Sequence, residues 1–459
     1  MRLLINTLKN IVHNKKSLFT FLYLITLSIF VLSIFGQGGD NSFQHSGRFL
    51  LFILIVPLLT KLVVQLLAAL GYNYLPENQT FNGGAKPKVS VLLPAWNEEV
   101  GIIKTMISVL ESHYSNFELI VINDGSTDNT HQLVTEFIDQ QQANYSASIK
   151  YLSLDNGGKA RALNKALEIA TGEIIVTVDA DCIMDADALT KFVQRFTTKN
   201  VGAVAGNVII ANNKKPIELI QQLEYVCGFF FKRSDAYFNA VHIIGGAAAA
   251  YRKEVLDNLR GFDEKLITED IEMSMRILGH GYQTRYAHDA VIFTEGPSDL
   301  AGLSKQRLRW KYGRILSYFR HRELFMSSNN QHNRYLSWFI LPLAVYSEIL
   351  LMLQGLVLTL FYGYSIVYQD YFALASMIII STSLVSMQIL MDSKSQHHKS
   401  LLFVAPIAWL LLYFIDFVEF KALVQSLKKL MKQESLQWQK WNRVGIGQQN
   451  NEQPVKATI

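Results

Sequence analysis

Hydrophobic residues are distributed unevenly, with long apolar stretches towards both ends of the chain and mixed polarity in the middle. The apolar stretches cover roughly residues 17–36, 48–75, 336–364, 371–391 and 401–423. Each is close to or above the ~20 residues that a membrane-spanning helix needs. The middle alternates short apolar runs with helix-like periodic segments, as globular domains do. The pattern therefore predicts a globular domain between two groups of membrane-spanning helices.

The charges beside the first two apolar stretches predict how they cross. Residues 1–16 are polar and basic, whereas the loop 37–47 contains no Lys or Arg. Because basic flanks stay in the cytoplasm, the middle domain should be cytoplasmic. A signal peptide is the competing interpretation, but no small-residue cleavage site is evident near Gly36. We expect two transmembrane helices within residues 1–75, with Lys61 facing protein or water because a charge in lipid is costly.

The C-terminal stretches raise a conflict of orientation. Residues 335–430 should form transmembrane helices, but three crossings would leave the basic tail outside, against the same rule. That tail, residues 431–459, contains Trp438 and Trp441 beside basic residues, as interfacial helices on anionic lipid do. We therefore expect a bent, non-crossing or hairpin segment within residues 401–430 and a cytosolic or interfacial tail.

Residues 86–325 have the pattern of an α/β domain. Strands are predicted at 89–93, 119–122, 149–153 and 173–179, and helices at about 128–142, 159–171 and 185–198. Strands that alternate with helices over short loops indicate a parallel, doubly wound sheet with right-handed crossovers. Later segments are a strand-like GNVII, an apolar-aromatic helix near Glu224 to Phe238, a helix from near Glu269 and a helix carrying residues 305–313.

Acidic and basic side chains follow several of these elements. Asp179 and Asp181 end the strand of EIIVTVDAD, where two carboxylates can hold a hard divalent cation together with a substrate diphosphate. An ordinary acidic turn is the alternative. Asp124, in NDGSTD, stands where an acid can bind a nucleoside, or where it can form an Asx-turn. GGKARALN places Lys159 and Arg161 at a helix N-terminus, which suits phosphate.

Three further segments each allow a functional and a purely structural interpretation. GGAAAAY, which starts at Gly245 and Gly246, either lets something approach the backbone closely or is a loosely packed helix. Thr268 can cap a helix whose first turn holds Glu269 and Asp270, or the three can be catalytic. QRLRW sets Arg307 and Trp310, and likewise Gln306 and Arg309, three apart on a helix, as a membrane-surface helix also would.

Composition supports a membrane protein and argues against two other classes. Only 18% of the 459 residues are charged, against about 25% in soluble domains. The net charge is +5, and most of the positive charges lie beside the apolar segments. This pattern is typical of membrane helix flanks and does not indicate a nucleic-acid-binding protein. Two cysteines, Cys182 and Cys227, exclude a disulfide framework, and no Cys/His cluster has zinc spacing.

In combination, these motifs resemble the inverting family-two glycosyltransferases with the GT-A fold. NDGS, DAD, TED and QRLRW follow one another at workable spacing, and Q-x-x-R-W is typical of the processive membrane members. The segments ITEDIEMSMRI, GLSKQRLRW and GGAAAAYRKEV are most similar to bacterial poly-β-1,6-N-acetylglucosamine synthases. No cyclic-dinucleotide-binding domain follows, which weakens a cellulose-synthase interpretation. The expected fold is a cytosolic, Rossmann-like GT-A domain with a mostly parallel sheet, flanked by transmembrane and interfacial helices.

The resemblance implies a role for each candidate residue. Asp270 would be the catalytic base, and Glu269 would orient groups beside it. Asp179 and Asp181 would hold Mg²⁺ or Mn²⁺ on the donor diphosphate, with Arg309 offsetting its charge. Asp124 would contact the nucleoside, with Lys159 as a second donor-binding candidate. On the acceptor side the resemblance places Gln306, Trp310, Gly245 and Gly246.

The implied function is processive transfer of a sugar, N-acetylglucosamine in first place, from a UDP-sugar to a β-linked polysaccharide. Synthesis would be coupled to export across the inner membrane, and a small accessory membrane subunit is a further partner that the resemblance suggests. Hyaluronan-, chitin- or β-glucan-type synthesis and a non-processive glycolipid transferase remain as alternatives. A scaffold with a dead domain is disfavoured, because Asp124, Asp179, Asp181, Asp270, Arg309 and Trp310 are all present.

Overall fold

The computed structural model describes residues 42–75, 86–369, 371–436 and 445–446. The first predicted membrane helix, residues 17–36, lies outside them. The chain divides into two compact units, which are described separately. The helical unit comprises Met1–Pro76, Leu223–Ala240 and Arg322–Lys428, and the sheet unit comprises Glu77–Gln222, Val241–His321 and Lys429–Ile459.

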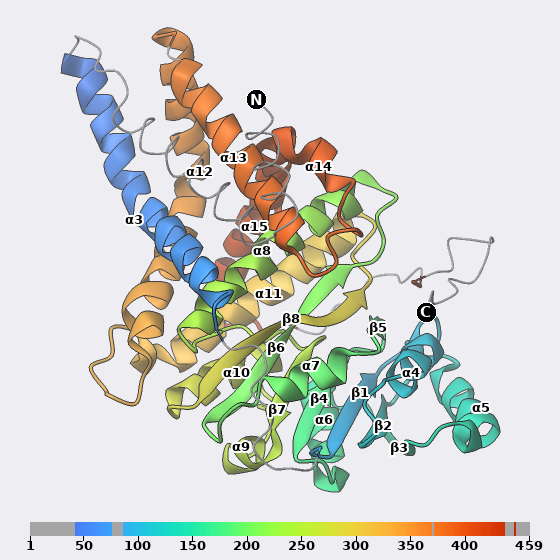
Figure 1. Ribbon diagram of the computed structural model, residues 1–459. Coiled ribbons are helices and arrows are strands. Elements are labelled where there is room, and N and C mark those ends of the chain that lie inside the picture. Colours follow the sequence, from blue (N-terminus) through green and yellow to red (C-terminus); the bar gives the residue numbers. More distant parts are fainter. Residues whose placement is uncertain (1–41, 76–85, 370, 437–444, 447–459) are drawn as a thin grey trace, which may run out of the picture. The chain divides into compact units, whose positions relative to one another are not determined.

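An eight-stranded mixed sheet forms the centre of the sheet unit (Figure 1), in the order β3-β2-β1-β4-β7-β6-β8-β5. The strands are β1 Val89–Ala95, β2 Phe117–Asp124, β3 Ser148–Leu154, β4 Ile174–Thr177, β5 Cys182–Met184, β6 Val201–Ile210, β7 Ala249–Arg252 and β8 Gln283–Thr294. β1 pairs in parallel with β2 and β4, and β2 with β3. β7 runs antiparallel to both β4 and β6, β6 and β8 are parallel, and β5 is antiparallel to β8.

Helices follow the strands along the chain. They are α4 Ile102–Leu110, α5 Thr130–Gln141, η1 Gln142–Asn144, α6 Lys159–Ile169, α7 Ala188–Gln194, α8 Pro216–Tyr237, α9 Lys253–Asn258, α10 Glu269–Gly279 and α11 Leu300–Arg320. Every residue of β1, β2, β4 and β6 is buried, as expected for strands covered on both faces. The predicted mostly parallel α/β sheet is confirmed.

Two local predictions need correction. The strand predicted at 173–179 ends at Thr177, although the Val178 N–H still donates to the Leu92 carbonyl at 3.1 Å. The run GGAAAAY is not a helix, because its last residues, from Ala249, form β7 between β4 and β6. Small side chains suit a strand that is covered by neighbours on both sides. The apolar-aromatic helix predicted near Glu224 is part of the longer α8.

The helical unit holds the long apolar helices. Its elements are α3 Ser42–Tyr72, the later part of α8, η2 Arg322–Leu324, η3 Leu336–Ile340, α12 Leu341–Val367, α13 Tyr371–Met391, α14 Leu401–Val404, η4 Ala405–Ile407 and α15 Ala408–Met431. Among the described residues, three helical segments are long and apolar enough to cross a membrane: Leu336–Val367, Leu374–Met391 and Leu401–Met431. Leu66, Ala69, Phe230, Met387 and Met391 form a buried cluster.

The last apolar segment is interrupted within its first turns. A 3₁₀ turn at Ala405–Ile407, which contains Pro406, separates α14 from α15. Proline removes a backbone donor and interrupts the helical ladder, which explains the break. Whether this segment crosses a membrane stays a prediction.

Candidate functional site

The Asp124 carboxylate fixes the turn that leads into α6. Gly157 N–H donates to its Oδ1 at 2.9 Å, and Gly158 N–H donates to its Oδ2 at 2.8 Å. Gly158 has a φ of +91°, which an L side chain rarely adopts, so glycine is required in this turn. Asp124 is buried at the end of β2. Its observed role is to position the start of α6, and contact with a nucleoside stays a prediction.

Lys159, the first residue of α6, joins two of the predicted motifs. Its Nζ lies 2.5 Å from Asp179 Oδ1 and 3.2 Å from Glu269 Oε1. Burial by itself lowers the pKa of Lys159, but the carboxylates around it, led by Asp179 and Glu269, raise that pKa above its usual value. The ammonium is therefore a permanent cation between the end of β4 and the start of α10.

The glycine-alanine run comes close to these charged groups. Gly246 N–H donates to Asp270 Oδ2 at 2.8 Å, and Thr177 Oγ1 donates to the Gly246 carbonyl at 3.0 Å. A Cβ at Gly246 would lie 2.9 Å from Lys159 Nζ, so any side chain there would press on the ion pairs. Of the two interpretations of this run, the close approach is the one observed. Gly245 borders open space.

Burial and neighbouring charge shift the acidity of the groups beside Asp270. Glu269 is buried, and burial followed by the nearby Asp270 raises its pKa, although Lys159 opposes the shift. Burial also raises the pKa of the Tyr251 phenol well above its usual value, and the charges of Asp270 and Glu269 add to that shift. Tyr251 lies in β7 and is a site neighbour that the sequence motifs did not identify.

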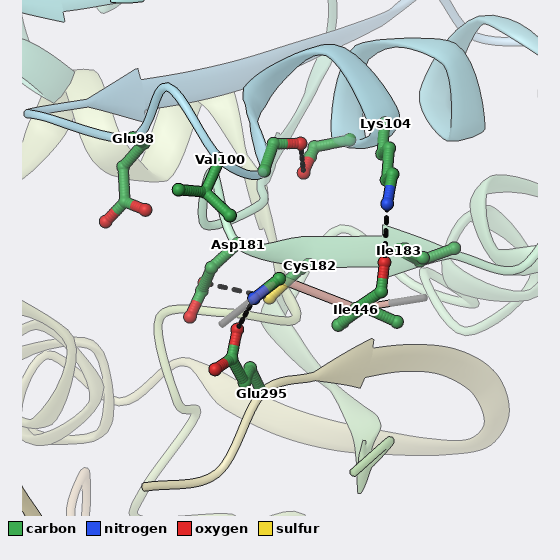
Figure 2. Close-up of a pocket in the computed structure, with 11 residues that line it drawn as sticks. Glu98, Val100, Lys104, Asp181, Cys182, Ile183, Glu295 and Ile446 are labelled. Atoms are coloured by element: carbon green, nitrogen blue, oxygen red, sulfur yellow. Dashed lines mark hydrogen bonds between the residues drawn. The ribbon is translucent and has the colours of Figure 1, made fainter. Parts of the chain in front are cut away.

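Asp181 lines a pocket that is also lined by Gly445 and Ile446 of the tail (Figure 2). Gly445 N–H donates to Glu295 Oε2 at 2.8 Å, and Lys104 Nζ donates to the Ile446 carbonyl at 2.9 Å. The pocket is lined by Glu98, Val100, Gly101, Lys104, Thr105, Asp181, Cys182, Ile183, Glu295, Gly445 and Ile446. The cytosolic or interfacial placement of the tail stays a prediction, since Trp438 and Trp441 lie outside the described residues. No sequence signal indicated that Gly445 and Ile446 would line this pocket.

The carboxylates of Asp179 and Asp181 suit Mg²⁺ or Mn²⁺ only if a substrate completes the site. Among the described residues, no group of three or more His, Cys, Asp or Glu side chains is placed to hold a metal. Mg²⁺ is commonly held by one or two carboxylates, with phosphates and water supplying the other ligands. The two hard oxygen donors therefore fit such a cation, bound together with a diphosphate.

The Q-x-x-R-W segment lies on α11, and its side chains are placed as the helical spacing predicted. The Arg307 guanidinium lies 4.5 Å from the centre of the Trp310 ring, so these two share a face. Arg309 and Trp310 are partly exposed. Gln306 Oε1 is buried and has no hydrogen-bond partner within the described chain. Arg307 is a further residue that the motif assignment had left without a role.

Residues 87–313 match a family model described as "Glycosyltransferase like family 2". The chain is 35% identical over 229 residues to a poly-beta-1,6-N-acetyl-D-glucosamine synthase of Staphylococcus epidermidis, covering 49% of this chain and 54% of that protein. It is 32% identical over 260 residues to a protein of the same name from Staphylococcus aureus (strain COL), covering 53% and 60%. The chain thus spans somewhat more than half the length of these curated relatives.

Among solved structures, the fold is similar to that of a mannosyltransferase from Pyrobaculum calidifontis in complex with GDP-Man and Mn²⁺. The TM-score is 0.55 at 20% identity, over 84% of this chain and 100% of that one. At this identity the match shows a shared fold, and it confirms the GT-A-like sheet domain followed by long apolar helices. Residues 87–313 therefore form a glycosyltransferase family 2 domain.

Proposed function

We propose that the chain transfers N-acetylglucosamine from UDP-N-acetylglucosamine to a growing β-linked polysaccharide, with inversion at the anomeric carbon. The observation that supports this best is the meeting of three motif segments around Lys159. Its ammonium contacts Asp179 of the DAD motif and Glu269 of the TED motif, while Asp270 is held by Gly246. Side chains distant in sequence thus form one charged site, as a donor and base centre requires. The similarity to two staphylococcal synthases favours this sugar and polymer.

In the proposed reaction an acceptor hydroxyl attacks the anomeric carbon of the donor. The new C–O bond forms on one face while the bond to the diphosphate breaks on the other, and UDP leaves. Asp270 takes the hydroxyl proton, which is worth about 10²–10⁴-fold in rate. Its Oδ2 accepts the Gly246 N–H bond, which fixes the direction of the carboxylate. Glu269 and Lys159 orient the groups around it.

The leaving diphosphate needs positive charge. Mg²⁺ or Mn²⁺, held by Asp179 and Asp181, would neutralise part of that charge when bound. Arg309 and Lys159 supply protein cations near the leaving group. Lys159 already pairs with Asp179, so donor binding would rearrange an ion pair that exists before the donor arrives. Asp124 would act on the nucleoside either directly or through the Gly157–Gly158 turn.

On the acceptor side, Trp310 offers a ring face to a sugar, and Gln306 and Gly245 border the same substrate. The long apolar helices would place synthesis at the inner membrane, with the sheet unit in the cytoplasm, and would couple elongation to export. An accessory membrane subunit would support the assembly. Hyaluronan-, chitin- or β-glucan-type products use the same chemistry, and so does single transfer to a lipid.

Product analysis tests the proposal. Membranes containing the full chain are incubated with individually radiolabelled UDP-sugars and Mg²⁺ or Mn²⁺, and products are sized and digested with linkage-specific hydrolases. We expect long polymer from UDP-N-acetylglucosamine that a poly-β-1,6-N-acetylglucosamine hydrolase degrades. A single added sugar would refute processive synthesis, and polymer from another donor would move the assignment to that polysaccharide. In proteoliposomes, polymer left entirely on the donor side would refute export.

A further inference from the structure

Glu272 is a buried carboxylate two residues after Asp270 on α10. Its side chain is 1% exposed. Residues two apart on a helix do not share a face, so Glu272 lies away from the side that carries Asp270. A carboxylate in such a place is costly unless donors surround it. Its partners therefore indicate what this residue does for the fold.

Those partners come from α10 itself and from the end of α11. Arg276 Nη2 donates to Glu272 Oε2 at 2.6 Å, and His321 Nε2 donates to Oε1 at 3.1 Å. His321 directly follows α11, and its neighbour Arg320 pairs through Nη2 with Asp263 Oδ2 at 2.6 Å. We refer to Asp263, Glu272, Arg276, Arg320 and His321 as the Glu272 network. It connects α10, α11 and the segment before α10.

A second contact brings the same two helices together near the candidate base. Thr268 is the residue before α10. A Cβ at Gly313 of α11 would clash with its Oγ1, so only glycine permits α11 to come this close to Thr268. α11 and the residue after it therefore meet the start of α10 twice, at Thr268 through Gly313 and at Glu272 through His321. Gln306 to Trp310 precede Gly313 on α11, and Asp270 follows Thr268. The two contacts therefore hold the QRLRW and TED motifs in place relative to each other.

The α6 helix is tied to the same region. Asn164 Nδ2 donates to the Phe262 carbonyl at 2.9 Å, and Phe262 N–H donates back to Asn164 Oδ1 at 2.8 Å. Arg276 Nη1 also donates to the Leu259 carbonyl at 2.7 Å, at the start of that segment. The helices that carry Lys159, Asp270 and the QRLRW motif are thus linked by one set of partly buried polar contacts.

We propose that Glu272 is a positioning residue that holds α10 against the end of α11, so that Asp270 meets an acceptor seated at Trp310. This inference rests on the proposed glycosyl transfer. The Glu272 carboxylate is occupied by Arg276 and His321, so it acts through Asp270 rather than on the substrate. Misplacement of a catalytic group by about 1 Å can cost ~10²-fold in rate. Loss of Glu272 should therefore slow transfer without weakening donor binding.

Steady-state kinetics of Glu272→Gln test this, with purified full-length protein in lipid nanodiscs and UDP-N-acetylglucosamine as donor. We expect kcat to fall roughly 10- to 100-fold, while the donor KM and the Kd of UDP change less than about twofold. Glu168→Gln is the matched control, because Glu168 forms only an exposed ion pair with Lys165 at 2.7 Å. Exposed pairs contribute little, so its kcat should stay near that of the wild type.

His321→Asn is the second variant, because it removes the 3.1 Å contact between His321 and Glu272 but leaves the Arg276 pair within α10 and the longer Arg320 contact at 3.9 Å. We expect a smaller fall in kcat with the same unchanged donor KM. Wild-type kcat in both variants would overturn the inference, as would equal loss of kcat and UDP affinity. If Glu272→Gln does not fold, His321→Asn alone decides. Wild-type protein that transfers no sugar from any UDP-sugar would refute the proposed function instead.

Discussion

At the scale of single residues, the site is a balance of charges around one lysine. Lys159 pairs with both Asp179 and Glu269, and the Gly246 N–H donates a hydrogen bond to Asp270. Asp179 is paired with the ammonium of Lys159, and Asp181 lines the neighbouring pocket. The metal-ligand role proposed for Asp181 and the base role proposed for Asp270 lead to different expectations for variants at these two positions.

Asp270→Asn should abolish sugar transfer while UDP binding survives. The amide keeps the size of the side chain and can still accept the Gly246 N–H bond, but it cannot take a proton. The rate should fall by about 10²–10⁴-fold. Radiolabel incorporation and UDP affinity are the two measurements. Turnover near that of the wild type would remove Asp270 from the base role.

Asp181→Asn should weaken donor binding only when the metal is present. The expected result is a several-fold loss of UDP affinity in Mg²⁺ or Mn²⁺ and little change in EDTA, because the lost carboxylate is a hard oxygen ligand. Calorimetric titration of the variant and the wild type with UDP under both conditions measures this. Equal metal dependence in the two proteins would count against Asp181 as a ligand.

At the scale of elements, close packing limits which side chains α11 and the sheet can accept. α11 lies so close to Thr268 that Gly313 has no room for a methyl group. On the other side of the domain, Glu118 of β2 is buried and salt-bridged to Lys150 at 2.8 Å. The Gly313–Thr268 contact positions α11, and the Glu118–Lys150 ion pair links β2 to β3.

Gly313→Ala should destabilise the protein and slow transfer. The new methyl group would displace α11 from the start of α10, and overpacking of this kind costs about 1–3 kcal/mol of the free energy of unfolding. Gly228→Ala on α8 is the control, because a Cβ there has nothing within 4 Å. Thermal unfolding and transfer rate are measured together. Equal behaviour of the two variants would show that the α10–α11 contact can relax.

Glu118 should make stability depend on pH in the acid range. Burial alone raises the pKa of Glu118, but hydrogen bonds from Lys150 and other donors outweigh it and lower the pKa from 4.5 to about 2. A lowered folded-state pKa means that the stabilisation is present above pH 4.5 and is lost as the pH falls towards 2.

The measurement compares denaturant unfolding of wild-type protein and Glu118→Gln across that pH range. The variant should be less stable at pH 7, and the difference should shrink as the pH falls from about 4.5 towards 2. Glu111→Gln, at an exposed position after α4, is the control and should show no such trend. A difference that stays constant with pH would contradict the assignment of this stabilisation to the Glu118 charge.

The sequence predicted elements that depend on local pattern and missed those that depend on distant partners. β1, β2 and β3 are apolar runs next to amphipathic helices, and periodicity was sufficient to find them. β7 is a short strand that begins Ala-Ala-Tyr, and alanine is uncommon in strands, so only its pairing with β4 and β6 makes it one.

The same limit applied to the site. The sequence singled out Asp179, Glu269 and Asp270 because they follow a strand or begin a helix in motifs of fixed order, and the structure brings Asp179 and Glu269 together at Lys159. Tyr251 was missed because its place depends on β7, and Gly445 was missed because nothing near it in sequence indicates Glu295 as its partner. The Glu272 network was missed for the same reason: a glutamate inside a helix gives no sign that it is buried.

At the scale of the whole molecule, neither unit is a continuous piece of chain. The helical unit is assembled from three segments, and the sheet unit resumes after each of them. Within the sheet unit, β4 lies between β1, which is earlier in the chain, and β7, which follows more than 70 residues later. The parallel strands β3, β2, β1 and β4 form the Rossmann-like half of the sheet, and β7, from the other half, pairs with β4 at its edge.

This arrangement determines which fragments of the chain can remain soluble. A piece that stops before Ala249 would keep β3, β2, β1 and β4 but would lose the strand that covers β4. The open backbone of Ile174–Thr177, fully buried in the intact sheet, would then be free to pair with another copy of the same fragment. Amyloid-like or swapped assemblies are the expected outcome, so an isolated fragment of the sheet unit should extend at least through β8.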